Sequence, residues 1–182
     1  APEWAQRSWH LMDTYGYLPF DLEPNGEAVS KTLEHGYGDA AVASVAKLLG
    51  QNETALRFAN RAKGYQHLWD VQTGVMRGRD SQGRWREPFN PDTPTSPLNN
   101  PGDYTEANAW QYFWTPAQYD IPGVMQLLGG EANFTKKLNA FFTTEALNPN
   151  KFLGQEAMIG QYAHGNEPSH HIIYLYAFTD QF

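Results

Sequence analysis

Apolar residues recur every three or four positions along several stretches of the chain, which is the spacing of one face of an α-helix. The first stretch covers residues 30–49, where Ser30 is a typical N-cap and Gly50 follows the end. The second covers residues 52–69 and begins at Asn52. Because the link between the two is very short, the pattern predicts an antiparallel helical hairpin.

A different pattern follows this hairpin. Regularly placed glycines and a turn sequence predict two short strands or a structured loop over residues 71–85. The five prolines between residues 87 and 102 exclude a regular helix there and favour a stiff, extended path. Loops of this length in compact domains are usually functional or disordered. This loop leads into residues 103–106, which adjoin one of the sequence blocks whose resemblance to a known family is described below, so we favour a functional role.

Three further helices are predicted, over residues 105–114, 120–128 and 131–142, with Asp120 as the N-cap of the second. A last helix is predicted to begin near Pro168, since proline is well suited to a first helical turn. The predicted fold class is therefore mostly α, built from helical hairpins that are joined by long loops. A short β-hairpin is compatible with this pattern.

Composition narrows the class of protein. The chain has 182 residues, a formal net charge of −7 and no cysteine. Its length suits one domain, and its negative charge argues against a nucleic-acid surface. No apolar run is long enough to cross a membrane. Aromatic residues make up 14% of the chain. Such an excess suits a carbohydrate-binding protein, although most of these rings are expected to pack between helices.

The segment 160–171 concentrates polar side chains immediately before an apolar run. Polar groups that gather at the start of a buried helix often build a site, because burying them unpaired is costly. Gln161, Asn166 and Glu167 form a set of oxygen donors of the type that calcium takes. An alternative role for Glu167 is to bind a sugar hydroxyl or to cap a helix.

The three histidines in this segment, His164, His170 and His171, also suggest zinc. Zinc sites on helices favour histidines at i and i+4, and these three do not have that spacing. A contact between His164 and a substrate hydroxyl, with helix-packing roles for His170 and His171, is the favoured interpretation. Satisfied core histidines remain the general alternative.

Glu106 lies among aromatic residues after the long loop. An apolar setting of this kind raises the pKa of a carboxyl group into a range that is useful for acid catalysis. On the residues alone, an ordinary acidic residue in a first helical turn, where the helix dipole favours it, is the preferred interpretation. Trp85 and Trp110 flank the loop and the Glu106 motif, so they are the candidate residues for stacking on a sugar. The run of arginines over residues 77–86 fits a solvated hairpin face or loop-anchoring ion pairs better than a phosphate site.

Five blocks of the sequence, in order, resemble the catalytic domain of glycoside hydrolase family 92, the calcium-dependent exo-acting α-mannosidases. The blocks are 30–34 (SKTLE), 74–79 (GVMRGR), 87–89 (EPF), 104–112 (YTEANAWQY) and 160–171 (GQYAHGNEPSHH). The resemblance implies an (α/α)6 toroid of six helix pairs, of which about half are present. Residues 1–182 are then expected to form one partial domain, without the β-sandwich that normally precedes the barrel or the C-terminal part of the barrel.

The resemblance also implies a mechanism. The parent enzyme would release terminal α-linked mannose from glycans with inversion, with Glu106 as general acid and the base outside this chain. Gln161, and less strongly Asn166, would bind Ca2+. His164, Glu167, Trp85 and Trp110 would contact the substrate. The enzyme is expected to be periplasmic or secreted, and this segment without the remaining ones is expected to be inactive.

Two other classes of protein stay open: an α/α-toroid glycosidase or lyase acting on another sugar, and a non-catalytic carbohydrate-binding module. The site assignment predicts that the backbone near Glu106 lies close to residues 161–167. It also predicts that helix faces meant to meet the rest of the barrel are exposed.

Overall fold

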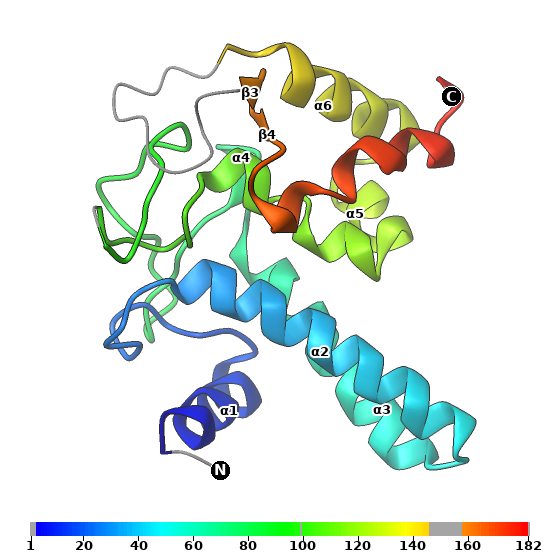
Figure 1. The fold of residues 1–182 in the computed structure, drawn as a ribbon. Coiled ribbons are helices and arrows are strands. Elements are labelled where there is room, and N and C mark those ends of the chain that lie inside the picture. Colours follow the sequence, from blue (N-terminus) through cyan, green and yellow to red (C-terminus); the bar gives the residue numbers. More distant parts are fainter. Residues whose placement is uncertain (1–2, 99, 146–157, 182) are drawn as a thin grey trace.

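The computed structural model describes residues 3–98, 100–145 and 158–181, and helices dominate it (Figure 1). The α-helices are α1 (Glu3–Tyr15), α2 (Ala28–Leu48), α3 (Asn52–Arg61), α4 (Ala109–Tyr112), α5 (Ile121–Leu127) and α6 (Glu131–Thr143). Short 3₁₀ helices cover Ala62–Leu68, Thr115–Gln118, Glu167–Ser169 and Ile172–Phe178. The mostly α prediction is confirmed, and the described residues do not by themselves close a barrel.

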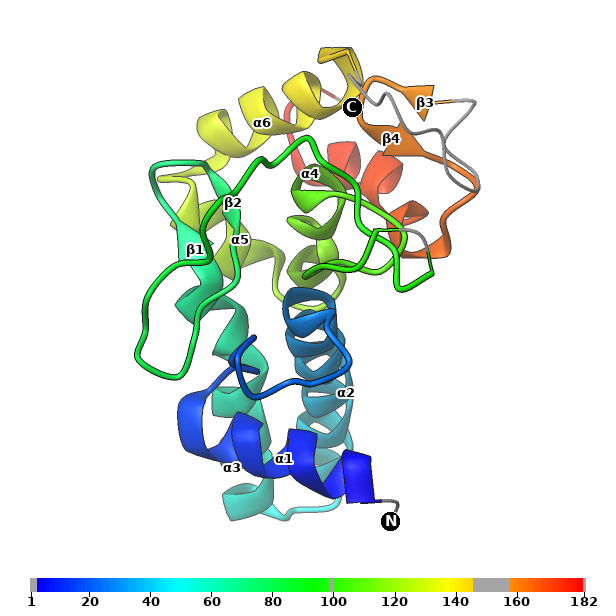
Figure 2. The ribbon, with the colours of Figure 1, turned by 90° about the vertical axis from the view of Figure 1, so that its left-hand side faces the viewer.

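Helices α2 and α3 form the predicted hairpin, which extends as a long arm away from α4, α5 and α6 (Figures 1 and 2). The predicted N-caps of both helices were wrong, whereas Gly50 does follow the end of α2 as predicted. The N-cap of α2 is Glu27, with Ser30 buried inside the first turns, and the N-cap of α3 is Gln51. The chain after α3 continues to Leu68 as a 3₁₀ helix rather than as α-helix. In this 3₁₀ helix, Gly64 lies so close to the backbone of Gly16 that a Cβ atom would overlap the Gly16 carbonyl oxygen.

Helix α1 was not predicted, and polar contacts tie it to the hairpin. The buried Arg61 guanidinium donates to both carboxylate oxygens of Asp39, at 2.5 and 2.7 Å, and to Asp13 of α1 at 3.0 Å. It also lies 3.6 Å from the ring centroid of Trp9. Ion pairs and a cation–π contact make much of this attachment, and the buried Met12 of α1 adds an apolar contact with Leu18 and Ala28.

A core of aromatic rings lies under α4, α5 and α6. Trp114 is fully buried and meets Phe113, Phe134 and Phe141 edge-on, with ring centroids 4.9, 5.4 and 6.1 Å away. Edge-to-face pairs of this kind stabilise a core beyond the area that they bury. Many of the aromatic residues therefore serve packing, as expected.

The helix predicted over residues 105–114 was wrong at both ends. Only Ala109–Tyr112 is α-helical, and a separate 3₁₀ helix, Thr115–Gln118, follows it. Asn108 is the N-cap, because its side chain accepts a hydrogen bond from the Gln111 N–H at 3.2 Å. The backbone before Asn108 is bonded to α2 instead of forming a helical turn, because the Asp103 carbonyl accepts from two N–H groups in the first turn of α2. Long-range bonds thus override the local helical pattern.

Two short strands do form near the region 71–85, but only the second lies inside it. Strands β1 (Trp69–Asp70) and β2 (Val75–Met76) pair antiparallel, with Trp69 opposite Met76. The proline-rich stretch after them has no described helix, as predicted. A second hairpin, of β3 (Met158–Ile159) and β4 (Tyr162–Ala163), was not predicted. The last helix, predicted near Pro168, is 3₁₀ in type and interrupted.

Gly36 and Gly38, both in α2, form a matched pair for testing helix packing. A Cβ atom on Gly36 would collide with the Tyr119 hydroxyl, whereas one on Gly38 meets nothing within 4 Å. We expect Gly36→Ala to lower the free energy of unfolding by about 1–3 kcal/mol through overpacking. Gly38→Ala is expected to raise it by about 0.5–1 kcal/mol through helix propensity. Urea unfolding of both variants measures these changes, and a gain from Gly36→Ala would contradict the packing described.

Candidate active site

One buried hydrogen bond joins the two polar motifs. The Asn108 side-chain amide nitrogen donates to the Gln161 amide oxygen at 2.9 Å, across 53 residues of sequence. Both side chains are buried, and α4 and β4 lie side by side in Figures 1 and 2. The prediction that the Glu106 region lies close to residues 161–167 is therefore confirmed.

Gln161 also bonds to residues at the end of α6. Its side-chain amide nitrogen donates to the Glu145 carbonyl at 3.2 Å, and its backbone N–H donates to the Phe141 carbonyl at 2.8 Å. The side chain thus connects α4 to the end of α6. The amide oxygen has a second lone pair beyond the one that Asn108 uses, so Gln161 can still accept a further bond. Its role as a metal ligand stays a prediction.

Asn166 and Glu167 lie at the start of the 3₁₀ helix that follows β4. The Asn166 side-chain amide nitrogen is buried and has no hydrogen-bond partner among the described residues. Buried donors are normally satisfied, so this nitrogen is an exception, and the role of Asn166 as a metal ligand stays a prediction. The Glu167 side chain is exposed, and no described contact restricts it to a capping role.

The histidines make local contacts. The His164 Nδ1 lies 2.6 Å from the Tyr162 hydroxyl, and its ring stacks on that of His170 with centroids 4.9 Å apart. The half-buried His171 bonds through Nε2 to the Trp114 carbonyl at 2.8 Å, and partial burial lowers the pKa of its imidazole. Within the described residues, no group of three or more His, Cys, Asp or Glu is placed to hold a metal ion. These contacts favour the packing roles over zinc.

Glu106 is half-buried and lies in a bend, three residues before α4. The expectation that it occupies a first helical turn is wrong, because its φ of 57° places it in the left-handed region. Few residues with a side chain adopt that conformation. The two residues that follow it have fixed positions: the Ala107 carbonyl accepts from the Thr95 N–H at 3.0 Å, and the Asn108 side chain bonds Gln161.

The Trp110 ring is held between the proline-rich loop and α6. Its indole N–H donates to Asp92 of the loop at 2.8 Å, and the Lys137 ammonium lies 5.0 Å from its ring centroid. The same ammonium lies 4.4 Å from the centroid of Phe113. Trp110 remains half-buried. A ring whose edge and face are both fixed loses little freedom when it binds a sugar.

Burial lowers the pKa of this Lys137 ammonium to about 8, whereas the ordinary value is 10.5. Between those two pH values the unfolded chain binds the extra proton and the folded chain does not. The free energy of unfolding is therefore expected to rise with pH across this window. The measurement is urea unfolding from pH 8 to 10.5 beside a Lys137→Met variant, which removes this titration. If both proteins show the same pH dependence, the prediction is wrong.

Trp85 packs within the β-hairpin region. The Arg79 guanidinium lies 4.5 Å from its ring centroid, and the two residues form an isolated antiparallel bridge. A contact between Trp85 and a sugar stays a prediction. Three of the neighbouring arginines form ion pairs, as the loop-anchoring interpretation predicted, and Arg79 bonds backbone carbonyls instead. Their partners are Asp70 and Glu87 for Arg77, the Gly83 and His67 carbonyls for Arg79, Asp80 for Arg84, and Asp103 for Arg86.

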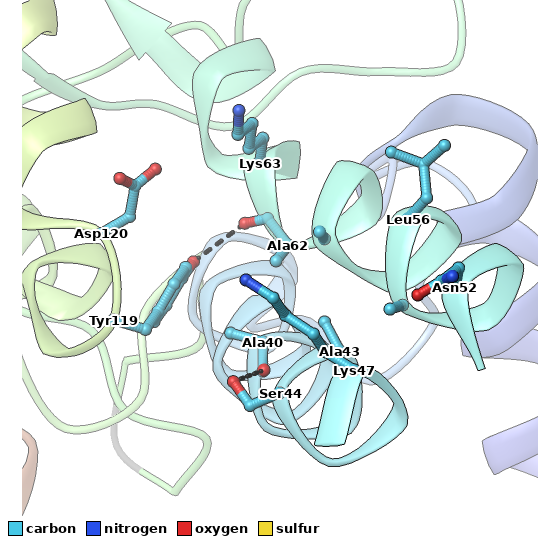
Figure 3. A pocket seen from close by; sticks show the side chains of 12 residues that line it. Ala40, Ala43, Ser44, Lys47, Asn52, Leu56, Ala62, Lys63, Tyr119 and Asp120 are labelled. Atoms are coloured by element: carbon cyan, nitrogen blue, oxygen red, sulfur yellow. Dashed lines mark hydrogen bonds between the residues drawn. The ribbon is translucent and has the colours of Figure 1, made fainter. Parts of the chain in front are cut away.

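The predicted site is separate from a cavity of about 480 Å³ on the α2–α3 arm. Alanines of both helices line much of it, together with Lys63, Tyr119 and Asp120, as Figure 3 shows. The Tyr119 hydroxyl donates to the Ala62 carbonyl at one edge. None of the residues predicted for catalysis or binding is among those that line this cavity. Sequence reasoning also did not single out Asn108 or Lys137, although asparagine two positions after Glu106 is a recognisable helix cap.

Comparison with known proteins identifies the family. The profile of the glycosyl hydrolase family 92 catalytic domain matches residues 2–182. A family 92 α-mannosidase of Bacteroides thetaiotaomicron, solved with mannoimidazole, is 43% identical with a TM-score of 0.80, over 91% of this chain and 22% of the other. A family 92 inverting mannosidase of that organism is 31% identical with a TM-score of 0.73, over 93% of this chain and 23% of the other. The search of curated proteins finds no match.

The chain thus spans between a fifth and a quarter of the length of these two structures. The match to the family profile covers almost every residue, and the blocks that suggested the resemblance all lie within it. This chain belongs to glycosyl hydrolase family 92.

Proposed function

We propose that this chain forms part of a glycoside hydrolase that releases terminal α-linked mannose from glycans. The observation that carries the proposal is the buried Asn108–Gln161 hydrogen bond, which brings the candidate acid motif beside the polar segment at β4. Membership of family 92 and the likeness to two mannosidases support the substrate class. Because the chain covers only part of those structures, activity is proposed for the full-length protein in which it occurs.

The proposed reaction is a single displacement with inversion. Glu106 protonates the departing glycosidic oxygen, and a carboxylate from outside this chain activates water on the opposite face of the sugar. Trp110 packs against the sugar ring. His164 and Glu167, both exposed beside the site, bind its hydroxyl groups. Trp85 is proposed to contact a more distant part of the glycan.

Calcium belongs to the proposal as a cofactor. It takes six to eight oxygen ligands, and Gln161, Asn166 and Glu167 offer two amide oxygens and one carboxylate. These donors fit calcium by type but are too few, so the remaining ligands are proposed to come from other segments of the protein. When bound, calcium acts as a Lewis acid that polarises and orients oxygen atoms of the substrate.

Those other segments are the proposed partners of the exposed apolar face on the α2–α3 arm. On this face Val45 is 56% exposed, Leu48 87% and Leu56 64%. Apolar patches of this kind mark contact surfaces, and completion of an (α/α)6 toroid would cover this one. No helix in the described part of the chain is long and apolar enough to span a membrane. We propose a periplasmic or secreted location by analogy with the family.

Mannose release from an α-linked mannobiose by the full-length protein tests the proposal. We expect release that a chelator abolishes and that added calcium restores. Release that the chelator does not affect would support the mannosidase assignment and contradict the proposed calcium cofactor. Glycan binding without release would indicate a non-catalytic module. The absence of both release and binding would overturn the proposal.

A further inference from the structure

Thr105 directly precedes Glu106, and each of its polar groups makes a hydrogen bond. The Thr105 N–H donates to the Ser30 hydroxyl at 2.8 Å, and the Thr105 hydroxyl donates to the Glu27 carboxylate at 2.5 Å. The Thr105 carbonyl accepts from the Tyr112 hydroxyl at 2.7 Å. These partners come from the start of α2 and from α4, so Thr105 is fixed from two directions.

The partners are themselves rigid. Ser30 is fully buried in α2, and Tyr112 is buried and stacked on Tyr104, with ring centroids 5.8 Å apart. The second carboxylate oxygen of Glu27 lies 3.7 Å from the Lys31 ammonium. A partner that is itself held in place limits the positions that Thr105 can occupy.

Glu27 and Glu106 are the only residues other than glycine with positive φ in the described part of the chain, at 61° and 57°. Such a conformation costs free energy and persists where the surroundings enforce it. Thr105 links the two strained residues, because its hydroxyl bonds the Glu27 carboxylate and it directly precedes Glu106 in the sequence. The carbonyl of Ala107, on the other side of Glu106, is fixed by the Thr95 N–H.

We infer that Thr105, Ser30 and Glu27 are positioning residues that aim the carboxyl group of Glu106. The inference rests on the proposed function of Glu106 as general acid. With both neighbours fixed and φ enforced, the direction in which the Glu106 side chain leaves the backbone is set before any substrate binds. Preorganisation of this kind matters because small misplacements of a catalytic group slow the reaction strongly.

The test uses leaving-group dependence in the full-length protein. An acid is needed for a sugar leaving group but hardly for 2,4-dinitrophenolate, so misaiming Glu106 affects only the first. We expect Thr105→Val to lower kcat/KM on α-linked mannobiose by about 10²-fold, with little change on 2,4-dinitrophenyl α-mannoside. Ser30→Ala is expected to act in the same direction. Thr105→Ser, which keeps the hydroxyl, is expected to recover most of the loss.

Thr135→Val is the matched control. The Thr135 hydroxyl of α6 is buried and has no partner among the described residues, so its removal leaves no bond broken. We expect this variant to behave like the parent on both substrates. Equal losses on both substrates for Thr105→Val and Ser30→Ala, or no loss on either, would overturn the inference. If instead Glu106→Gln shows no leaving-group dependence, it is the proposed function that fails.

Discussion

Glu106→Gln is expected to lower kcat/KM of the full-length protein on an α-linked mannobiose by about 10²–10⁴-fold, the usual contribution of a general acid. Glutamine has nearly the same shape as glutamate and tolerates the left-handed backbone at position 106 equally well, so folding should be preserved. It cannot supply a proton to the leaving oxygen. Initial rates of mannose release, measured beside the parent protein, give the effect.

The control for this prediction is the substrate. On 2,4-dinitrophenyl α-mannoside, whose leaving group needs little protonation, the same variant should lose less than about 10-fold. Thermal unfolding of parent and variant should coincide. Near-full activity of Glu106→Gln on the mannobiose would remove Glu106 as the acid, and the search would then move to other carboxyl groups of the full-length protein.

Arg61→Ala is expected to lower the free energy of unfolding of this chain by about 3–5 kcal/mol, because it leaves a buried charge without its partner. Asp39 is 4% exposed and receives two hydrogen bonds from the Arg61 guanidinium. The substitution also removes the contact with Asp13 and with the Trp9 ring, so α1 loses much of its attachment. Urea unfolding followed by circular dichroism measures the change.

Arg57→Ala is the matched control, since Arg57 pairs with the same Asp13 from an exposed position. Its side chain is 57% exposed and its distance to the Asp13 carboxylate is 2.7 Å. Exposed pairs contribute at most about 1 kcal/mol, so we expect a much smaller loss than for Arg61→Ala. Similar losses in the two variants would mean that burial of the Arg61–Asp39 pair is not what stabilises the junction.

Glu106→Gln and Arg61→Ala are expected to separate an effect on catalysis from an effect on stability. Glu106 lies in a bend that long-range hydrogen bonds hold, whereas Arg61 lies at the junction of α1 with the hairpin. The first substitution should change rates with little effect on unfolding. The second should change unfolding, and rates only through loss of folded protein.

The helical hairpin of α2 and α3, the short strands near residue 75, and helices α5 and α6 could be predicted from the sequence. Each depends on contacts between residues close in the chain: a periodic apolar face, a cap such as Asp120, or a glycine just past the end. The side chain of Asp120 does accept from the Gly123 N–H at 3.0 Å. The candidate chemistry could also be found, because it lies in compact blocks that resemble one family.

The tertiary structure decided where those blocks meet and how their residues are oriented. The start of α4, the left-handed backbone of Glu106 and the attachment of α1 all depend on bonds between distant residues. Thr105 and Ser30 are 75 positions apart, and Asn108 and Gln161 are 53 apart. Local propensity contributes only tenths of a kcal/mol to about 1 kcal/mol per residue, so a few buried long-range hydrogen bonds outweigh it. The pattern of residue types along the chain does not show which distant residues will form those bonds, so only the folded structure reveals them.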